Sequence, residues 1–158
     1  MHATEENLPE HRIRPMTVED VDSVLSIERT SFAKPWTRSM FLSELNNPIS
    51  HSFVVTSATP RGWAATAYII FWVVQNEAHI LDLAVRPGFR RRGIGRMLLE
   101  TMLERMEDIF VAEVFLEVRK SNRAARRLYR ELGFREAFER KNYYGDEDAV
   151  VMTYRMGE

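Results

Sequence analysis

A short run of arginines and glycines stands directly before a helix-like pattern. Three arginines at 90–92 run into Gly93-Ile94-Gly95, and the residues that follow have the spacing of an amphipathic helix. The first turn of a helix leaves backbone N–H groups without intrahelical partners, at the positive end of the helix dipole. Glycine lets a bulky anion approach this backbone, and arginine side chains add charge-assisted hydrogen bonds. These residues could therefore bind a phosphate group.

Two common phosphate-binding loops do not fit this stretch. The chain lacks the Gly-Lys-Ser/Thr ending of a nucleotide-hydrolase loop, and the third glycine of a dinucleotide-binding loop would fall on Leu98. The pattern therefore disfavours a nucleotide hydrolase and a dehydrogenase. A loop that needs glycine only for its turn, with solvated arginines, remains the structural alternative.

Two further residues carry groups that could move protons. In the strand-like stretch "EVFLEVR" (113–119), Glu117 lies on the face opposite the apolar side chains, together with Phe115 and Arg119. By pattern alone, Glu117 would form a surface ion pair with Arg119 or with a neighbouring strand. Tyr129 lies on the apolar stripe of a helix-like segment, which is typical of a core tyrosine.

Four blocks of the sequence together resemble a known family. "RRRGIG" (90–95) fits the Arg/Gln-x-x-Gly-x-Gly/Ala signature of the GNAT superfamily of acetyl-coenzyme A-dependent N-acetyltransferases. Within that superfamily, "FAKPW", "LDLAVRPGFRRRGIGRMLLE", "FLEVRKSNRAARRLYRELGF" and "RKNYY" are similar to the RimI-type ribosomal-protein alanine N-terminal acetyltransferases. The resemblance covers residues 12 to 155 in the same order.

The resemblance implies acetyl-coenzyme A as the cosubstrate. The backbone N–H groups of 91–96 would hold the coenzyme A pyrophosphate, and the pantetheine arm would lie along 83–85. Asn122 matches an asparagine that contacts the cofactor in the family, and it is equally suited to cap a helix. The cofactor-binding residues would then be Leu83, Ala84, Val85, Arg90, Arg91, Arg92, Gly93, Ile94, Gly95, Arg96 and Asn122.

The resemblance also assigns the catalytic roles, with Glu117 as the general base and Tyr129 as the general acid. An N-terminal amine has a pKa of about 7.7 to 8.0, against about 10.4 for lysine, so a single carboxylate is enough base. A tyrosine can protonate the thiolate that leaves. The reaction needs no metal. The histidines have no metal-ligand spacing and are interpreted as incidental: His2, His11, His51 and His79.

Two aromatic segments match the loops that flank the peptide entrance in N-terminal acetyltransferases. Phe32, Pro35 and Trp36 belong to the first, and Tyr143 and Tyr144 to the second. These side chains could clamp an extended N-terminal backbone. Alternatively, they pack beneath their own loops, as large aromatic side chains commonly do.

The elements that must position these residues can be placed from hydrophobic periodicity and turn signals. The pattern predicts a flexible segment at 1–11 and a single domain at 12–158, with an α/β fold in the order βααβββαβαββ. The resemblance implies that this domain has the GNAT fold. The central sheet is expected to be mixed and mostly antiparallel, flanked by helices. The predicted elements are a strand at 12–16, helices at 17–30 and 37–46, strands at 52–57, 63–74 and 78–85, a helix from 94, a strand at 113–119, a helix at 122–132, and strands at 134–144 and 148–156.

Composition limits the partners. The 22 Lys and Arg residues nearly balance the 23 Asp and Glu residues, which gives no global attraction to nucleic acid or to an anionic membrane. The absence of cysteine removes disulfides and thiolate chemistry. Without a signal-like or membrane-spanning run of apolar residues, we expect a cytoplasmic monomer.

The expected reaction is transfer of an acetyl group to the N-terminal amine of a protein, with an alanine of a small-subunit ribosomal protein as the expected target. A broader N-terminal or lysine acetyltransferase is the first alternative. Arginines at 90–92 and 119–130 could instead form a nucleic-acid surface, on a binding module or a ribosome-docking enzyme. A cofactor-binding regulator without activity is the last alternative.

Overall fold

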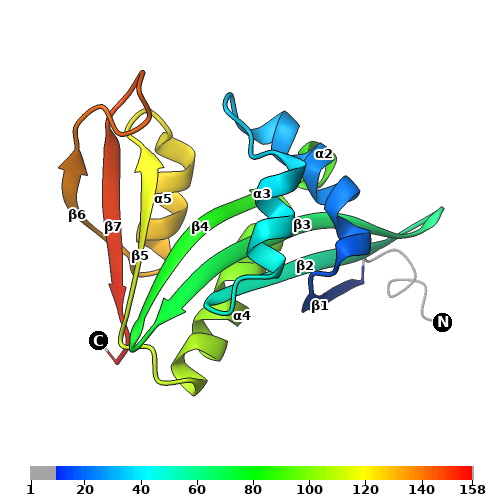
Figure 1. Cartoon of the computed structure of the whole chain (residues 1–158), viewed down its shortest axis with the longest axis horizontal. Coiled ribbons are helices and arrows are strands. Elements are labelled where there is room, and N and C mark those ends of the chain that lie inside the picture. The colour runs from blue at the N-terminus through cyan, green and yellow to red at the C-terminus, as the bar shows by residue number, and fades with distance from the viewer. Residues whose placement is uncertain (1–9, 158) are drawn as a thin grey trace. The chain divides into compact units, whose positions relative to one another are not determined.

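The computed structural model describes residues 10–157, so that most of the expected flexible segment lies outside the described residues. Two short 3-10 turns are present that the sequence did not indicate, and the order of helices and strands confirms the predicted βααβββαβαββ (Figure 1). The elements are β1 (His11–Pro15), η1 (Val18–Asp20), α2 (Val21–Ser31), α3 (Arg38–Leu45), β2 (Ser50–Thr59), β3 (Gly62–Val74), β4 (Glu77–Val85), η2 (Pro87–Phe89), α4 (Ile94–Asp108), β5 (Glu113–Arg119), α5 (Arg123–Glu131), β6 (Arg135–Arg140) and β7 (Ala149–Arg155).

The strands form a mixed sheet in the order β1-β2-β3-β4-β5-β7-β6. β4 and β5 are parallel, whereas β1 with β2, β5 with β7, and β6 with β7 are antiparallel. This confirms the expected mixed, mostly antiparallel sheet. The chain divides into two compact units, the first ending at Ile70 and resuming at Asp82–Leu98, the second formed by Phe71–Leu81 and the residues from Leu99 onward. The expected single domain stays a prediction.

The first unit contains β1, β2, most of β3, the end of β4 and the two helices α2 and α3. Helix α2 buries one apolar face, which includes Val21, Val24 and Ile27. Its predicted start differs from the observed one, because residues 18–20 form a 3-10 turn before the helix begins at Val21. Asp20 closes that turn, since its carboxylate accepts two hydrogen bonds of 2.7 Å from Arg14 and one of 2.8 Å from the Thr17 N–H.

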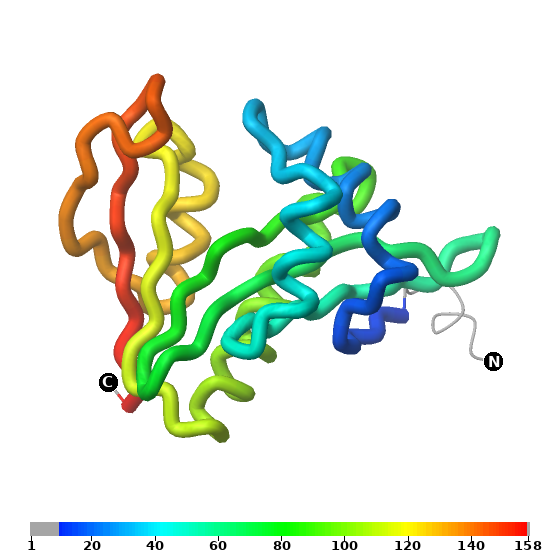
Figure 2. The backbone as a smooth tube through the Cα atoms, viewed as in Figure 1, coloured from blue at the N-terminus to red at the C-terminus, as the bar shows by residue number. Residues whose placement is uncertain are grey.

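The second unit contains β5, β6, β7 and α5. Strand β7 runs between β5 and β6, so the two strands that flank α5 in the sequence are not neighbours in the sheet (Figure 2). Alternate residues of β5, Val114, Leu116 and Val118, are buried as predicted. Strand β6 ends at Arg140 rather than at 144, because the chain turns with a positive φ of 53° at Asn142 and of 86° at Gly145. Residues 141–144 therefore belong to a turn.

Candidate active site

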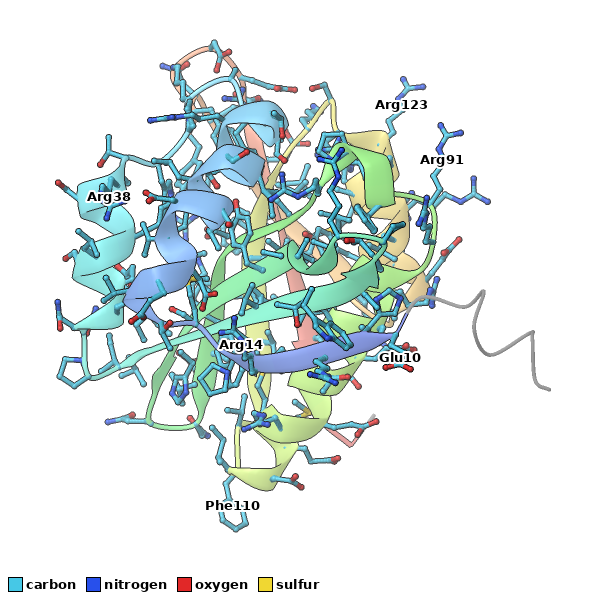
Figure 3. All side chains as sticks on the ribbon, turned by 90° about the vertical axis from the view of Figure 1, so that its right-hand side faces the viewer. Glu10, Arg14, Arg38, Arg91, Phe110 and Arg123 are labelled. Carbon is cyan, nitrogen blue, oxygen red and sulfur yellow. The ribbon has the colours of Figure 1, made fainter. Side chains whose placement is uncertain are left out.

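The predicted phosphate-binding segment is an exposed helix start in the first unit. Gly93 has a φ of +79° and Arg91 a φ of +64°, so the chain bends sharply before α4. Met97 N–H donates to the Gly93 carbonyl at 3.0 Å, which closes the first turn of α4. The Arg91 side chain points away from the ribbon (Figure 3). Binding of the pyrophosphate by this segment stays a prediction.

Gly95 and Arg90 connect this segment to the end of β4. A Cβ atom at Gly95 would lie 3.3 Å from Val85 Cγ2, so this glycine allows α4 to start close to the strand. Arg90 Nε donates to the Val85 carbonyl at 2.9 Å, and its Nη2 donates to Ser31 Oγ at 3.0 Å. The Arg90 side chain therefore braces the expected pantetheine segment, 83–85, against the end of α2.

The first aromatic segment follows directly after α2. Phe32 is 37% exposed and Pro35 is also exposed, whereas Trp36 is half-buried. The Trp36 ring packs on Phe41 with a centroid distance of 5.2 Å. The backbone N–H of Trp36 donates to Glu28 Oε2 at 2.8 Å. Trp36 thus packs beneath its own loop, as the structural alternative holds, while Phe32 and Pro35 remain available at the surface.

Glu117 has partners in the second unit that the sequence did not indicate. Its side chain is only 8% exposed, and Oε1 lies 2.7 Å from His79 Nε2. The Tyr143 hydroxyl donates to the same oxygen at 3.5 Å, and Arg140 Nε lies 3.7 Å from Oε2. Arg119 forms its ion pairs with Asp146 and Glu147 instead. Of the two expected partners, the one on a neighbouring strand is confirmed by His79 of β4, whereas Arg119 as the partner and the surface position of Glu117 are wrong.

His79 corrects the interpretation that the histidines are incidental. Its ring stacks on Phe115 with a centroid distance of 4.3 Å and an interplanar angle of 12°. The two residues are register partners in the parallel pair of β4 with β5, and Glu117 lies two residues further along the same face of β5. The sequence shows His79 only as a polar residue near the start of a strand in which polar and apolar residues alternate. Its contact with Glu117 depends on how β4 pairs with β5, which the local pattern does not indicate.

Arg119 holds the second aromatic segment. Its guanidinium lies 4.3 Å from the centroid of the Tyr144 ring and forms ion pairs with Asp146 at 2.9 Å and Glu147 at 3.4 Å. The rings of Tyr143 and Tyr144 meet edge to face at 5.0 Å. Half of the Tyr143 residue is exposed, and burial and the Glu117 charge raise the pKa of its hydroxyl.

Tyr129 and Asn122 both lie at α5. Tyr129 is half-buried and packs on Phe134 at a centroid distance of 5.7 Å, and no residue of α5 is fully buried, so the core-tyrosine interpretation does not hold. Burial and the neighbouring Tyr143, Glu117 and Tyr129 raise the pKa of Tyr144.

The Asn122 side chain caps α5 by accepting from the Ala125 N–H at 3.1 Å. Its cofactor contact stays a prediction.

Carboxylates pair with most arginines of α5, which bears on the alternative of a nucleic-acid surface. Arg126 and Arg130 both pair with Glu136, at 2.9 and 2.8 Å. Arg127 pairs with Glu131 and Lys120 with Glu139, each at 3.2 Å. Together with the ion pairs of Arg119, these contacts leave few free cations on α5 and weaken that alternative.

Residues 10–157 contain neither a candidate metal site nor a membrane-spanning helix. No group of three or more His, Cys, Asp or Glu side chains in this part of the chain could hold a metal ion. Over the same residues, no helix is long and apolar enough to cross a membrane. The expectation that the chain needs no metal stays a prediction.

Comparison with known proteins places this arrangement in a family. Residues 21–134 match the Acetyltransferase (GNAT) family. The ribosomal protein bS18-alanine N-acetyltransferase of Salmonella typhimurium is 39% identical over 142 residues, which cover 87% of this chain and 93% of that protein. The N-alpha-acetyltransferase of Sulfurisphaera tokodaii is 33% identical over 154 residues, with coverage of 91% and 92%.

A solved structure agrees with the sequence comparisons. The crystal structure of the ribosomal-protein-S18-alanine N-acetyltransferase from Escherichia coli superposes with a TM-score of 0.84 at 36% identity, and covers 94% of this chain and 96% of that one. The expected fold is therefore confirmed. With the family match over most of its length and relatives of this identity, the chain belongs to the GNAT family of acetyltransferases.

Proposed function

We propose that this acetyltransferase transfers the acetyl group of acetyl-coenzyme A to the N-terminal α-amine of a protein, with Glu117 as the general base and Tyr129 as the general acid. The observation that carries the proposal is the Glu117 carboxylate, which is nearly buried and fixed by His79 at 2.7 Å. A carboxylate held in this way can accept a proton without reorienting.

The proposed residues account for both protons of the reaction. The neutral amine attacks the thioester carbonyl, so a C–N bond forms and the C–S bond breaks. Glu117 takes the proton that the amine loses. Tyr129 gives its hydroxyl proton to the departing sulfur, because a phenol with a pKa of about 10 can protonate a thiolate whose conjugate acid has a pKa of about 8.5.

His79 orients the base in this scheme. An ionised carboxylate only accepts hydrogen bonds, so His79 Nε2 must carry the proton in the contact with Glu117 Oε1. The stacking of the ring on Phe115 limits its rotation. His79 therefore occupies Oε1 of Glu117, and the amine would approach Oε2, which also lies 3.7 Å from Arg140 Nε.

Two segments of the first unit would hold the cosubstrate, which supplies the acetyl group and leaves as a thiol. The start of α4 would offer the backbone N–H groups of its first turn and a glycine with positive φ to the pyrophosphate. The backbone of 83–85, braced by Arg90, would pair with the pantetheine arm. Asn122 would contact the cofactor from its cap position in the second unit.

The relatives support a specific substrate, the N-terminal alanine of ribosomal protein bS18. The Salmonella typhimurium relative carries this substrate in its name. Phe32, Pro35 and Trp36 on one segment, and Tyr143 and Tyr144 on the other, would contact the first residues of the peptide. A small first side chain is expected to be accepted best.

The test uses the purified full chain, acetyl-coenzyme A and a peptide that has both an N-terminal alanine and an internal lysine. Mass spectrometry of the product locates the acetyl group, and a peptide series that varies the first residue measures specificity. Label on the α-amine is expected. Label mainly on the lysine would refute the proposal in favour of a lysine acetyltransferase.

A further inference from the structure

The first unit contains a buried acidic cluster that the proposed chemistry does not use. Glu28 on α2 is 1% exposed, and Asp82 on β4 and Tyr68 on β3 are also buried. A buried carboxylate is costly unless donors surround it. We therefore expect the Glu28 carboxylate to accept hydrogen bonds from neighbouring groups and so to fix their positions.

Two hydrogen bonds hold the Glu28 carboxylate. Oε2 accepts the Trp36 N–H at 2.8 Å, and Oε1 accepts a very short hydrogen bond from the Tyr68 hydroxyl. Burial and the neighbouring Glu28 raise the pKa of Asp82 well above its usual range.

The same segment is also fixed by aromatic packing. The Trp36 ring lies on Phe41, and the Phe41 ring meets Tyr68 edge to face at 5.8 Å. Phe41 and Tyr68 are both fully buried. One end of the 32–36 segment is thus anchored in two ways, by the hydrogen bond from the Trp36 backbone N–H to Glu28 and by the packing of the Trp36 ring on Phe41. The exposed residues of the segment include Phe32 and Pro35.

Asp82 adds a link to the expected cofactor segment. It directly precedes Leu83, the first of the three residues expected to pair with the pantetheine arm. Its Oδ2 atom has no hydrogen-bond partner within residues 10–157. Asp82 therefore belongs to the backbone that leads into the cofactor segment 83–85, and Glu28 is bonded to the backbone of the 32–36 segment. Both residues lie in the first unit.

We propose that Glu28 is a positioning residue for peptide binding, which fixes the 32–36 segment through the backbone N–H of Trp36 while the Tyr68 hydroxyl holds its carboxylate. This inference rests on the proposed role of that segment in binding the substrate N-terminus. Glu28 touches neither substrate nor cofactor in this scheme, so it should affect the affinity for peptide more than the chemical step.

The first experiment compares the full-length Glu28→Gln variant with the wild type. The amide has one acceptor oxygen where the carboxylate has two, so it cannot keep both the bond from the Trp36 N–H and the bond from the Tyr68 hydroxyl. We therefore expect the KM for the peptide to rise about tenfold, as for loss of one hydrogen bond to a charged group. The kcat and the KM for acetyl-coenzyme A should stay within about twofold. The amide resonance of Trp36 in a proton–nitrogen NMR spectrum should move upfield and its hydrogen exchange should accelerate. Glu19→Gln, at an exposed glutamate before α2, is the matched control.

A second variant keeps the test decisive if Glu28→Gln does not fold. Tyr68→Phe preserves the packing on Phe41 and removes only the hydroxyl that donates to Glu28. It should raise the peptide KM by a smaller factor, about threefold, and move the Trp36 amide resonance in the same direction.

The outcomes separate this inference from the proposed function. An unmoved Trp36 resonance with an unchanged peptide KM would overturn the positioning role, as would an equal loss in kcat and in the affinity for both substrates. Phe32→Ala decides the remaining case, in which the resonance moves but the peptide KM does not. If Phe32→Ala raises the peptide KM, the inference about Glu28 fails alone; if it has no effect, the substrate role of the segment fails and the inference fails with it.

Discussion

Replacing Glu117 by glutamine tests the proposed base with little structural change. The glutamine keeps the volume of the side chain and an oxygen that can accept from His79 Nε2, now at 2.7 Å. It loses the ionic contact of 3.7 Å with Arg140, whose side chain is 47% exposed. Such a partly exposed pair contributes at most about 1 kcal/mol, which corresponds to a fall in Tm of about 2 to 4 °C.

The expected loss of activity is much larger than this loss of stability. Removing a general base lowers turnover by about 10²-fold to 10⁴-fold. An α-amine with a pKa of about 8 is roughly one-tenth neutral at pH 7 and about nine-tenths neutral at pH 9. The variant should therefore recover by up to about tenfold between pH 7 and pH 9, as the amine loses its proton without help.

The assay follows the release of the coenzyme A thiol at saturating substrates across this pH range. Glu113→Gln is the control, because it places the same substitution on the same strand at a glutamate that pairs with Arg155 at 3.4 Å. An equal loss in Glu113→Gln would contradict the reasoning. So would a Glu117→Gln variant that keeps more than about a tenth of the wild-type turnover at pH 7.

Three further predictions concern other parts of the chain. Tyr129→Phe should lower turnover by about 10²-fold to 10⁴-fold with little change in Tm, and a parallel fall of both in thermal denaturation would indicate a packing role instead. In Gly95→Ala the added methyl group meets a side chain at 3.3 Å, so the KM for acetyl-coenzyme A should rise about tenfold, whereas Gly88→Ala, with open space around the position, should leave it unchanged in the same steady-state assay. Arg14 lowers the pKa of Asp20, so this pair stabilises the fold above the unfolded pKa of about 3.9 and the stabilisation is lost as the pH falls through the folded pKa; urea unfolding should show Asp20→Asn less stable than the wild type at pH 7, with the difference vanishing in acid.

Local patterns in the sequence were enough to predict most of the elements. The alternation in 113–119 placed Glu117 on the face opposite the apolar residues, and the glycines at 93 and 95 marked the start of α4. Each of these signals lies within one segment, because a strand or helix pattern depends on residues that are close together in the sequence. The segments therefore give the order of the elements along the chain.

The contacts that define the candidate site depend on strand pairing, which the sequence did not indicate. His79 meets Glu117 because β4 and β5 are parallel and in register from Glu77 with Glu113. Glu28 resembled an ordinary polar residue of an amphipathic helix, and only the packing of α2 shows that it is buried. The partners of both glutamates are distant in the chain, so no local pattern could identify them.

The position of β7 has a consequence for the synthesis of the protein. β5 and β6 emerge from the ribosome before β7, yet each of them pairs with β7 in the finished sheet, from Glu113 with Arg155 at one end of β5 to Arg119 with Ala149 at the other. Domains commonly fold in the order in which they are made. In the second unit this order cannot apply strand by strand, because β5 and β6 must wait for residues 149–155 to clear the exit tunnel. The edges of β5 and β6 that pair with β7 therefore stay unpaired in the nascent chain until residues 149–155 have left the tunnel, and chaperones that bind such edges would have their longest opportunity at this stage.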